Sequence, residues 1–435
     1  MKQLYVKFAS MLSVACAASF MSPLVLAESP TFDVSGQWAL RYENITNPLF
    51  PTTDDRFNQH NQRLSSKLQV KTVMKWSQFE LVGELGDSRV YLDNDDPTLG
   101  RSQVNTLEPV QFHFSWLGSG STGSGWSMKK TSVGRFILDH GSRRIISSGY
   151  FRNAMNTFDG AVSDWQWNDW NVRGVYLLPV TRLPGDAASI DANERSFDKS
   201  YSERAIYGVY ASSADKTWQL QTYWFDEEDG PGLNTANREF LTVSAHYTLP
   251  KDTKWRADAE VIVQSGTRHQ STSPSDVTEI DHQAWLFHGA FGQMVTDTTS
   301  LQAIVDLISG DNDSSDGKNT NFDALYGVRR FDFGPTEVYR TMPRRNLVSL
   351  GLKMVSKFTK KDNLLIRYLN FSYQKTPVGG ESEIGNQIEF RWRHQLLPKF
   401  RLEFGGAYMA KGDAFAQGDY PDDTVYGYTA FLLKF

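Results

Sequence analysis

Gln387-Ile-Glu-Phe-Arg-Trp-Arg-His-Gln-Leu-Leu-Pro-Lys-Phe-Arg-Leu-Glu-Phe404 is the stretch whose pattern decides the fold. Apolar and polar residues alternate on both sides of a tight connection at Leu397-Pro398. Since successive side chains of a strand point to opposite faces, this alternation predicts two half-polar strands joined by a short turn. One face carries Ile388, Phe390, Trp392, Phe400, Leu402 and Phe404, and the other carries Gln387, Glu389, Arg391, Arg393, Arg401 and Glu403.

The same alternation recurs in about 17 runs along the chain, and most of them have the length that a tilted membrane strand needs. Clear examples are residues 36–43, 61–72, 110–116 and 254–263, and weaker candidates lie near 159–167 and 322–331. Bacterial barrels of this kind have an even number of strands. The pattern therefore predicts an all-β fold, a transmembrane antiparallel β-barrel of about 18 strands in a single domain.

The connections between the runs support this prediction. Some are tight, as at residues 213–215, 249–252 and 397–398. Others are long and rich in Gly, Asp, Asn, Ser and Thr: 44–60, 87–107, 181–202, 226–236, 265–281, 309–321, 374–383 and 410–424. Short and long connections roughly alternate, which is typical of an outer-membrane barrel with turns on one rim and surface loops on the other.

A soluble β-sandwich or propeller would also show alternating strands. No repeat of 40 to 50 residues appears, however, and aromatic residues make up 13% of the chain. The chain ends in an aromatic strand, residues 428–435, which resembles the sorting signal that the barrel-assembly machinery reads at Phe435. A TonB-dependent receptor is disfavoured because no plug of suitable length precedes the first strand near Phe32.

The N-terminus predicts export. Residues 1–27 combine Lys2 and Lys7 with an apolar run and a small-residue cleavage pattern, so we expect a signal peptide, followed by the barrel over 28–435. Cys16, the only cysteine, lies inside that peptide; a lipoprotein reading of this cysteine stays open. Removing two lysines changes the net charge from −5 to −7, which argues against a nucleic-acid partner.

Residues 134–160 are unusually rich in arginine. The first part reads as a strand with Arg135, Ile137 and Asp139 on one face and an apolar opposite face. We expect the charged face to line the lumen and the apolar face, formed by Phe136 and Leu138, to meet lipid. From Gly141 onward we expect a loop or short strand that folds towards the pore.

Several segments together resemble the alginate export family of outer-membrane porins. They are Gly134–Ile145, Phe151–Asn153, Phe158–Gly160, Leu81–Arg89, Ser309–Asp311 and Gly327–Pro335, in the family's order. The resemblance implies an 18-stranded monomeric barrel that passes a polyuronate through an arginine-rich constriction. The mature chain departs from the pattern in its overall acidity and in the Asp clusters of its long loops.

We predict that the pore constriction contains Arg135, Arg144, Arg152, Arg89 and Arg329, with Asp139 and Asp159 pairing with some of them. Guanidinium groups bind carboxylates bidentately, so a ring of them would concentrate polyanions. The alternative is that these charges simply line a wide aqueous lumen, which needs no specific function.

Metal and catalytic motifs are sparse. Asp311, Asp313 and Asp316 form a weak calcium candidate, since Phe322 occupies the position of the bidentate glutamate in an EF-hand loop; we otherwise predict no cofactor. The chain has no Gly-x-Ser-x-Gly elbow and no His-Glu-x-x-His motif, so we predict that it is not an enzyme. A barrel hydrolase with Ser or Asp near His across strands remains an alternative.

The sequence thus predicts a monomeric channel in the bacterial outer membrane that passively conducts an anionic saccharide or polysaccharide such as alginate or its oligomers. Because a passive pore follows the solute gradient, this covers export and uptake alike. The alternatives are a less selective small-solute porin and a surface-binding barrel with a plugged lumen. Its partners would be the saccharide, outer-membrane lipid and the barrel-assembly machinery.

Overall fold

The computed structural model describes residues 29–48, 60–93, 96, 99–118, 120, 125–334, 342–416 and 422–435. The predicted signal peptide, residues 1–27, and Cys16 within it lie outside the described residues. Among the described helices, none is both long enough and apolar enough to cross a membrane.

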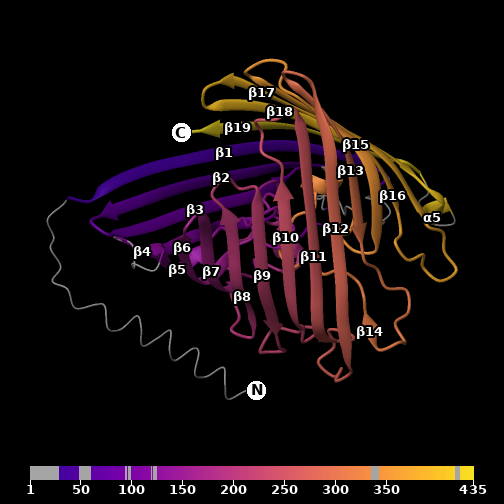
Figure 1. Cartoon of the computed structure of the whole chain (residues 1–435), viewed down its shortest axis with the longest axis horizontal. Helices are drawn as coiled ribbons and strands as arrows, with labels where there is room; N and C mark the ends of the chain where they lie inside the picture. Colours follow the sequence, from indigo (N-terminus) through magenta and orange to yellow (C-terminus); the bar gives the residue numbers. More distant parts are fainter. Residues whose placement is uncertain are drawn as a thin grey trace.

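The regular secondary structure of the described chain is almost entirely strand (Figure 1). The strands are β1 Thr31–Thr46, β2 His60–Trp76, β3 Phe79–Tyr91, β4 Asn105–Leu117, β5 Trp126–Phe136, β6 Phe158–Trp167, β7 Trp170–Pro179, β8 Arg204–Ser213, β9 Trp218–Glu227, β10 Glu239–Thr248, β11 Trp255–His269, β12 Glu279–Thr296, β13 Thr299–Ile308, β14 Lys318–Asn319, β15 Leu347–Ser356, β16 Asp362–Ser372, β17 Glu383–Leu397, β18 Phe400–Lys411 and β19 Thr424–Lys434. Three short helices are α3 Ala187–Asp191, α4 Arg330–Phe333 and α5 Asp413–Ala416.

The sheet closes on itself. Each long strand pairs antiparallel with its neighbours, and β1 pairs with both β2 and β19, so no edge is left open. The two-residue β14 adds to β12 in parallel, while β13 pairs directly with β15. Without β14, the described strands form a closed antiparallel barrel of 18, which confirms the predicted fold class and strand number.

Short and long connections lie on opposite rims, as predicted. One rim has brief turns such as 77–78, 168–169, 297–298 and 398–399, and we call it the short-turn rim. The other, the long-loop rim, carries the extended connections. The weaker strand candidate at 159–167 is confirmed as β6, whereas the one at 322–331 is wrong, because those residues form coil that leads into α4.

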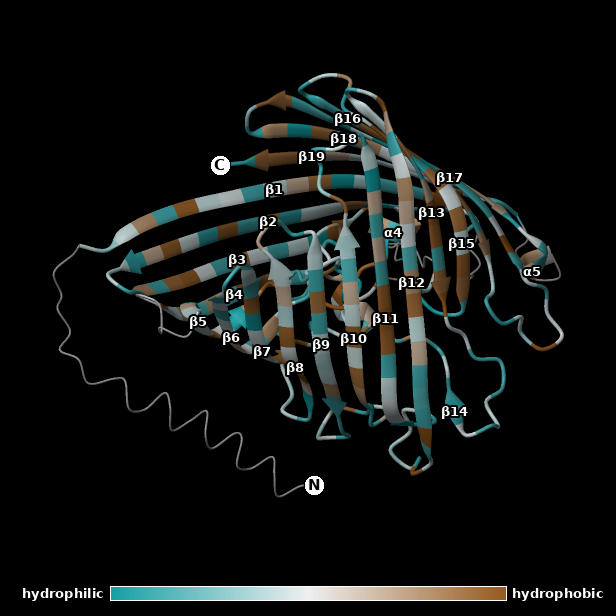
Figure 2. Ribbon diagram, in the orientation of Figure 1, coloured by the Kyte–Doolittle hydropathy of each residue, from teal (hydrophilic) through white to brown (hydrophobic). Residues whose placement is uncertain are grey.

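Hydrophobic and hydrophilic residues alternate along many of the strands, as the bands in Figure 2 show. The outer face of the barrel is apolar. Outward positions such as Phe112, Val133 and Ile388 are more than half exposed, because they meet the space that lipid occupies. Inward neighbours such as Arg63 and Ser115 are buried.

Two long connections fold into the lumen. We call residues 137–157 the first inner segment, and residues 320–334 with 342–346 the second inner segment. They join through backbone hydrogen bonds, from Tyr326 N to Ile145 O at 3.0 Å and from Val328 N to Arg143 O at 3.0 Å. The expectation that the chain folds towards the pore from Gly141 onward agrees with this arrangement.

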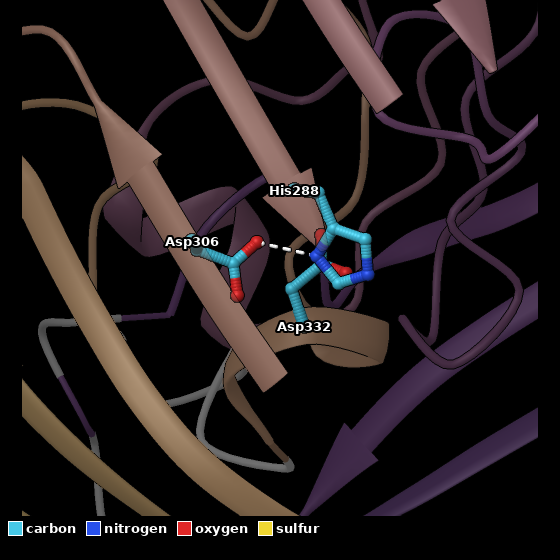
Figure 3. Close-up of side chains that lie close together, drawn as sticks. All are labelled: His288, Asp306 and Asp332. Atoms are coloured by element: carbon cyan, nitrogen blue, oxygen red, sulfur yellow. Dashed lines mark hydrogen bonds and ion pairs between the residues drawn. The ribbon is translucent and has the colours of Figure 1, made fainter. Parts of the chain in front are cut away.

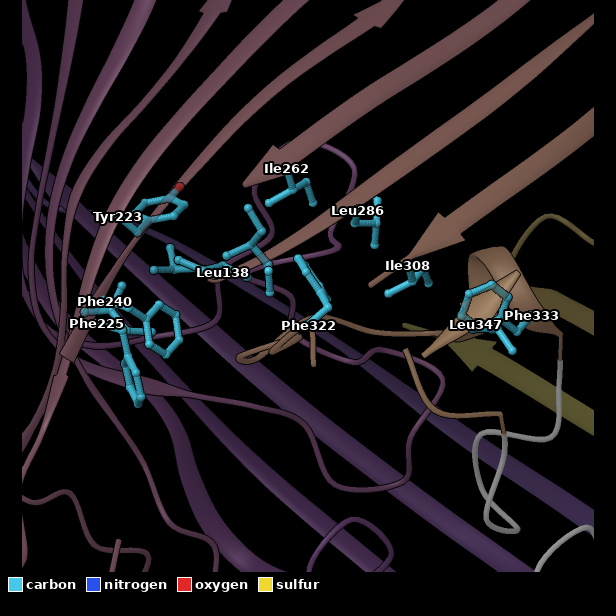
Figure 4. Packing of buried hydrophobic residues seen from close by; sticks show 14 of the residues in the cluster. Leu138, Tyr223, Phe225, Phe240, Ile262, Leu286, Ile308, Phe322, Phe333 and Leu347 are labelled. Atoms are coloured by element: carbon cyan, nitrogen blue, oxygen red, sulfur yellow. The ribbon is translucent and has the colours of Figure 1, made fainter. Parts of the chain in front are cut away.

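An apolar core inside the barrel holds these segments (Figure 4). Leu138, Phe322 and Phe333 of the inner segments pack against inward side chains of the wall, among them Tyr223, Phe225, Phe240, Ile262, Leu286, Ile308 and Leu347. Phe136 and Leu138 therefore face the lumen and not lipid, contrary to our expectation for the strand at 134–140. The apolar face turned inward because it meets a packed core instead of water.

Candidate functional site: a cationic cavity in the lumen

A cavity of about 390 Å³ lies on the side of the lumen that the apolar core leaves open. We call it the cationic cavity, because seven basic side chains and only two carboxylates line it. The basic residues are Arg41, Lys67, Arg143, Arg330, Arg391, Arg393 and Arg401, and the acidic ones are Asp139 and Glu403.

The β17–β18 hairpin supplies three of the arginines. The register pairs Arg393 with Glu403, Arg391 with Gly405 and Gln395 with Arg401, so the three guanidinium groups lie on adjacent rungs. On the opposite face Trp392 stacks on Phe404 at 5.8 Å between ring centroids, which fits an outward aromatic belt. Alternation with period two thus forces the arginines inward.

Glu403 is shared among several cations. Its carboxylate lies 2.6 Å from Arg393 Nε, 3.7 Å from Arg330 Nη2 and 3.7 Å from Arg401 Nη2. The Tyr428 hydroxyl donates a further hydrogen bond to it at 2.7 Å. One carboxylate cannot neutralise three guanidinium groups, so the cluster keeps a positive excess.

Arg391 lies one rung from the Arg393–Glu403 pair on the inward face of β17. Its Nε is buried and has no hydrogen-bond partner among the described residues. Arg391 therefore has donors left over for a ligand, and a carboxylate or sulfate oxygen would satisfy them.

On the same wall, Arg41 of β1 and Lys67 of β2 hold the first inner segment. Arg41 Nη1 donates to the Phe151 carbonyl at 2.6 Å, and Lys67 Nζ donates to the Tyr150 and Arg152 carbonyls at 2.6 and 2.8 Å. Arg41 also pairs with Glu43 at 3.1 Å. The wall thus fixes the segment's backbone while the side chains of Tyr150 and Phe151 line the cavity.

Arg330 reaches the cavity from α4. Its guanidinium carbon lies 3.3 Å from the centroid of the Phe151 ring, and Arg41 covers the same ring at 4.1 Å. Arg367 of β16, paired with Glu389 at 2.5 Å, donates to the carbonyls of Phe331 and Asp332 at 2.6 and 2.7 Å. The wall therefore binds α4 through its backbone and positions Arg330.

Asp332 joins the two inner segments to each other. It accepts from Arg144 of the first segment at 2.7 Å and from Arg344 of the second at 2.5 Å. Arg144 also pairs with Glu260 of β11 at 2.6 Å. Burial alone would raise the pKa of Asp332, but Arg144 and Arg344 hold it well below its ordinary value.

A histidine and two aspartates meet beside this joint (Figure 3). Among the described residues, His288, Asp306 and Asp332 are the one group with three potential metal-ligand atoms within 4.8 Å of one another. His288 already bonds Asp306 at 2.7 Å and Asp258 at 3.4 Å. Because the Asp332 oxygens are occupied by two guanidinium groups, whose charges repel a cation, we interpret the group as part of the anchor of α4.

Three of the predicted constriction residues lie on the outer face of the barrel. Arg135 shares the outward face of β5 with Val133 and pairs with Asp159 at 2.7 Å and with Glu108 at 2.6 Å. Arg89 shares the outward face of β3 with exposed side chains and pairs with Asp87 at 2.9 Å. Both arginines lie near the strand ends at the long-loop rim. We therefore exclude Arg89, Arg135 and Asp159 from the proposed constriction.

The other predicted residues belong to the inner segments. Asp139 lines the cationic cavity, 3.8 Å from Arg143, and accepts from the Ser148 backbone N–H at 2.9 Å. Arg144 supports the cavity through its buried ion pairs. Arg152 contributes its carbonyl to Lys67, and Arg329 directly precedes Arg330 at the start of α4.

Sequence reasoning overlooked Arg393 and Arg401 as site residues. Their signal was present, since both alternate with large apolar residues in the stretch 387–404. The prediction selected arginines because they are frequent in residues 134–160. It did not use the alternation of inward and outward positions along each strand, so it included Arg135, which points outward.

The calcium candidate residues lie in an exposed loop on the long-loop rim. Asp311 and Asp313 accept from the backbone N–H groups of residues that follow them, as Asp316 does from Lys318 at 2.9 Å. These bonds form local turns, and the three carboxylates are not among the described groups whose ligand atoms converge.

Comparisons with known proteins agree on the family and the fold. A sequence profile described as alginate export matches residues 31–425. No curated protein matches the chain.

Solved porin structures share the fold. A BenF-like porin from Pseudomonas fluorescens Pf-5 has a TM-score of 0.60 at 11% identity, covering 93% of this chain and 98% of that one. OccAB1 from Acinetobacter baumannii has a TM-score of 0.58 at 13% identity, covering 92% and 96%. OpdK from Pseudomonas aeruginosa, solved with vanillate, has a TM-score of 0.56 at 11% identity, covering 93% and 99%.

Proposed function

The chain belongs to the alginate export family of outer-membrane barrels, and on that premise we propose that it is a passive channel for anionic saccharides of the uronate type. The observation that carries the proposal is the cationic cavity, where seven basic side chains meet two carboxylates. In a partly dehydrated lumen such an excess lowers the energy of an anion and raises that of a cation.

The spacing of the cations favours a chain with repeated carboxylates. Arg391, Arg393 and Arg401 lie on adjacent rungs of one hairpin, and Arg41 and Lys67 line the same cavity from the adjoining strands β1 and β2. A second cavity, of about 590 Å³, is nearly balanced in charge, since four basic and three acidic side chains line it and Lys130 pairs with Glu80 at 3.2 Å. Lys71 is a further basic residue in its lining. A polyuronate could exchange one guanidinium for the next as it advances, so that no single site holds it tightly.

A small carboxylate is the second candidate solute. OpdK, which shares the fold, was solved with vanillate, an aromatic carboxylate. The cavity volume of about 390 Å³ also suits a single small anion. This candidate predicts that monomeric carboxylates block the current as well as uronate oligomers do.

The plugged-barrel alternative gains support from the apolar core, which fills the space between the inner segments and inward side chains of strands from β5 to β18. It predicts negligible conductance in a planar bilayer. The cationic cavity favours a conducting path, and an ohmic current from purified protein would reject the plugged alternative.

The test is a planar-bilayer recording of the wild type and of a triple variant, Arg391→Gln, Arg393→Gln and Arg401→Gln. We expect anion selectivity in the wild type and block by a mannuronate trimer. Each lost charged hydrogen bond should weaken block, and the triple variant should lose at least about tenfold. Arg89→Gln is the matched control, because Arg89 lies on the outer face and its loss should leave block unchanged. Cation selectivity of the wild type would contradict the proposal.

A further inference from the structure

Two aromatic rings are exposed inside the lumen. Tyr150 of the first inner segment is 43% exposed and Phe331 of the second is 50% exposed. Large apolar side chains on the strands are exposed to this degree on outward positions such as Phe112 and Val133, where lipid covers them. Lipid cannot cover Tyr150 and Phe331, because both line the cationic cavity.

Both rings are held in place by polar contacts. The Tyr150 hydroxyl donates to Gln37 Oε1 at 3.0 Å. The Phe331 backbone is fixed through its carbonyl, which accepts from Arg367 Nη1 at 2.6 Å. Exposing an apolar ring to water costs free energy, and a fixed backbone prevents the ring from moving into the core. Such a ring is typical of a site where a bound molecule covers it.

Phe151, which lies between them in the cavity lining, shows what a covered ring looks like. Arg41 lies over it at 4.1 Å and Arg330 at 3.3 Å, so it is closed by guanidinium groups. Phe331 has Arg143 at 5.0 Å and Tyr150 has Lys67 at 4.7 Å, and both keep large exposed areas. Phe431 of β19 also lines the cavity but stacks on Phe400 at 6.2 Å between ring centroids. Among the rings that the inner segments bring to the cavity, Tyr150 and Phe331 are thus the ones left open to a solute.

We propose that Tyr150 and Phe331 form a stacking subsite for the pyranose ring of a uronate, next to the arginines that bind its carboxylate. This inference rests on the proposed function and adds recognition of the sugar ring to recognition of charge. A pyranose presents C–H groups on its faces, and the negative face of an aromatic ring attracts such weakly positive hydrogens. The carboxylate projects from the edge of the sugar ring, so it can reach a guanidinium while the ring stacks.

The arrangement of Arg143 matches this geometry. Its side chain is 41% exposed and lies near Phe331 as well as Asp139, at 3.8 Å from the latter. A sugar that stacks on Phe331 would bring its carboxylate close to this guanidinium, which is only weakly engaged. Aliphatic polycarboxylates offer the charge without the ring face and gain nothing from the subsite.

The experiment compares two blockers of the current, a mannuronate trimer and tricarballylate, which carries three carboxylates on an aliphatic chain. For Phe331→Leu and for Tyr150→Leu we expect the half-blocking concentration of the trimer to rise about fivefold, as the loss of a ring contact implies. The value for tricarballylate should stay unchanged. At Phe331, leucine keeps most of the apolar volume and removes the aromatic face. At Tyr150 it also removes the hydroxyl that donates to Gln37, so Phe331→Leu is the cleaner of the two variants.

Phe358→Leu is the matched control, since Phe358 is 53% exposed on a short turn outside the cavity, and it should leave the half-blocking concentration of both blockers unchanged.

Equal weakening of block by both compounds in Phe331→Leu would overturn the subsite, because it would indicate a displaced α4. Unchanged trimer block would overturn it as well. In either case, loss of trimer block in the triple arginine variant would leave the proposed function intact, whereas a wild type that neither blocker affects would reject both. Stronger block by vanillate than by the trimer would assign the rings to aromatic acids and overturn the sugar assignment.

Discussion

The lumen has two regions that differ in what their inward side chains meet, and we call them the packed side and the cationic side. On the packed side, which strands from β5 to β18 form mainly towards the long-loop rim, inward residues such as Phe225, Phe240 and Ile262 pack against the inner segments and are fully buried. On the cationic side, towards the short-turn end of β17 and β18, Arg391, Arg393 and Arg401 face a cavity. The strands follow the same alternation on both sides. The position of a residue in the alternation along its strand thus determines whether its side chain points into the lumen. The placement of the inner segments then determines whether that side chain contacts protein or solute.

The two sides also differ in what they contribute. Burying apolar side chains stabilises the inner segments by about 25 cal/mol per Å². Gathering guanidinium groups around one carboxylate, Glu403, is repulsive and contributes no comparable stability. The packed side therefore holds the shape of the lumen, and the cationic side acts on the solute. Substitutions that affect one side only can test this division.

The largest expected effect is at the joint between the inner segments. Asp332→Asn would leave the buried guanidinium groups of Arg144 and Arg344 without their shared carboxylate. Removing one partner of a buried pair costs about 3 to 5 kcal/mol, so we expect the free energy of unfolding to fall by that order. Urea unfolding followed by tryptophan fluorescence measures it, and bilayer recordings should show a larger, noisier conductance as α4 is released.

Asp313→Asn is the control for this change. Asp313 lies in an exposed loop and bonds Ser315 nearby, so its substitution should alter the free energy of unfolding by less than about 0.5 kcal/mol. A steady wild-type conductance in the Asp332→Asn variant would show that the packed side holds the segments without this joint.

A smaller effect is expected from acid on the packed side. His140 is fully buried, contacts Tyr223 Oη at 2.7 Å and stacks on Tyr210 at 5.1 Å. Burial, together with the charge of Arg173, lowers the pKa of His140 to about 3. Because the pKa of His140 is lower in the folded protein than in the unfolded chain, the unfolded chain binds the proton more readily. The contribution of His140 to stability is therefore complete above about pH 6.5 and falls as the pH drops towards about 3, with a loss of about 3 kcal/mol near pH 4.5.

The measurement is the difference between unfolding free energies at pH 7.5 and pH 4.5. In His140→Gln, which keeps a polar group for Tyr223 but cannot be protonated, this difference should be smaller by about 3 kcal/mol. His60→Gln, at an exposed site at the start of β2, should behave as the wild type does. Identical acid sensitivity in the wild type and His140→Gln would disprove the effect.

The sequence predicted the barrel well because period two is a local pattern that every strand repeats. It predicted 18 strands and the alternation of short and long connections. It failed at residues 134–140, where Phe136 and Leu138 turned inward, because an apolar residue faces lipid only where the lumen holds water. The sequence analysis also placed Arg135 in the constriction. Arg135 points outward near the end of β5, because it is two residues from the outward Val133 and shares its face.

Other parts of the site depend on contacts that no local pattern records. The joint at Asp332 links residues that are 188 and 12 positions apart in the chain, to Arg144 and Arg344. Such pairing depends on how two long connections fold against each other. The arginines of the β17–β18 hairpin were predictable, in contrast, because Arg391, Arg393 and Arg401 alternate with apolar residues in the opening stretch.

The smallest expected change in stability is on the cationic side, and it tests the comparison most directly. Arg391→Gln removes a charge that lies near other arginines and whose Nε has no partner among the described residues. We expect the free energy of unfolding to stay within about 1 kcal/mol of the wild type, while anion selectivity falls. Arg367→Gln is the matched contrast on the neighbouring strand. Arg367 binds Glu389 and the backbone of α4, so its loss should cost several times more. If both substitutions destabilised the barrel equally, the arginines of the cationic cavity would have a structural role. The division of the lumen into a packed side that stabilises the fold and a cationic side that binds the solute would then be wrong.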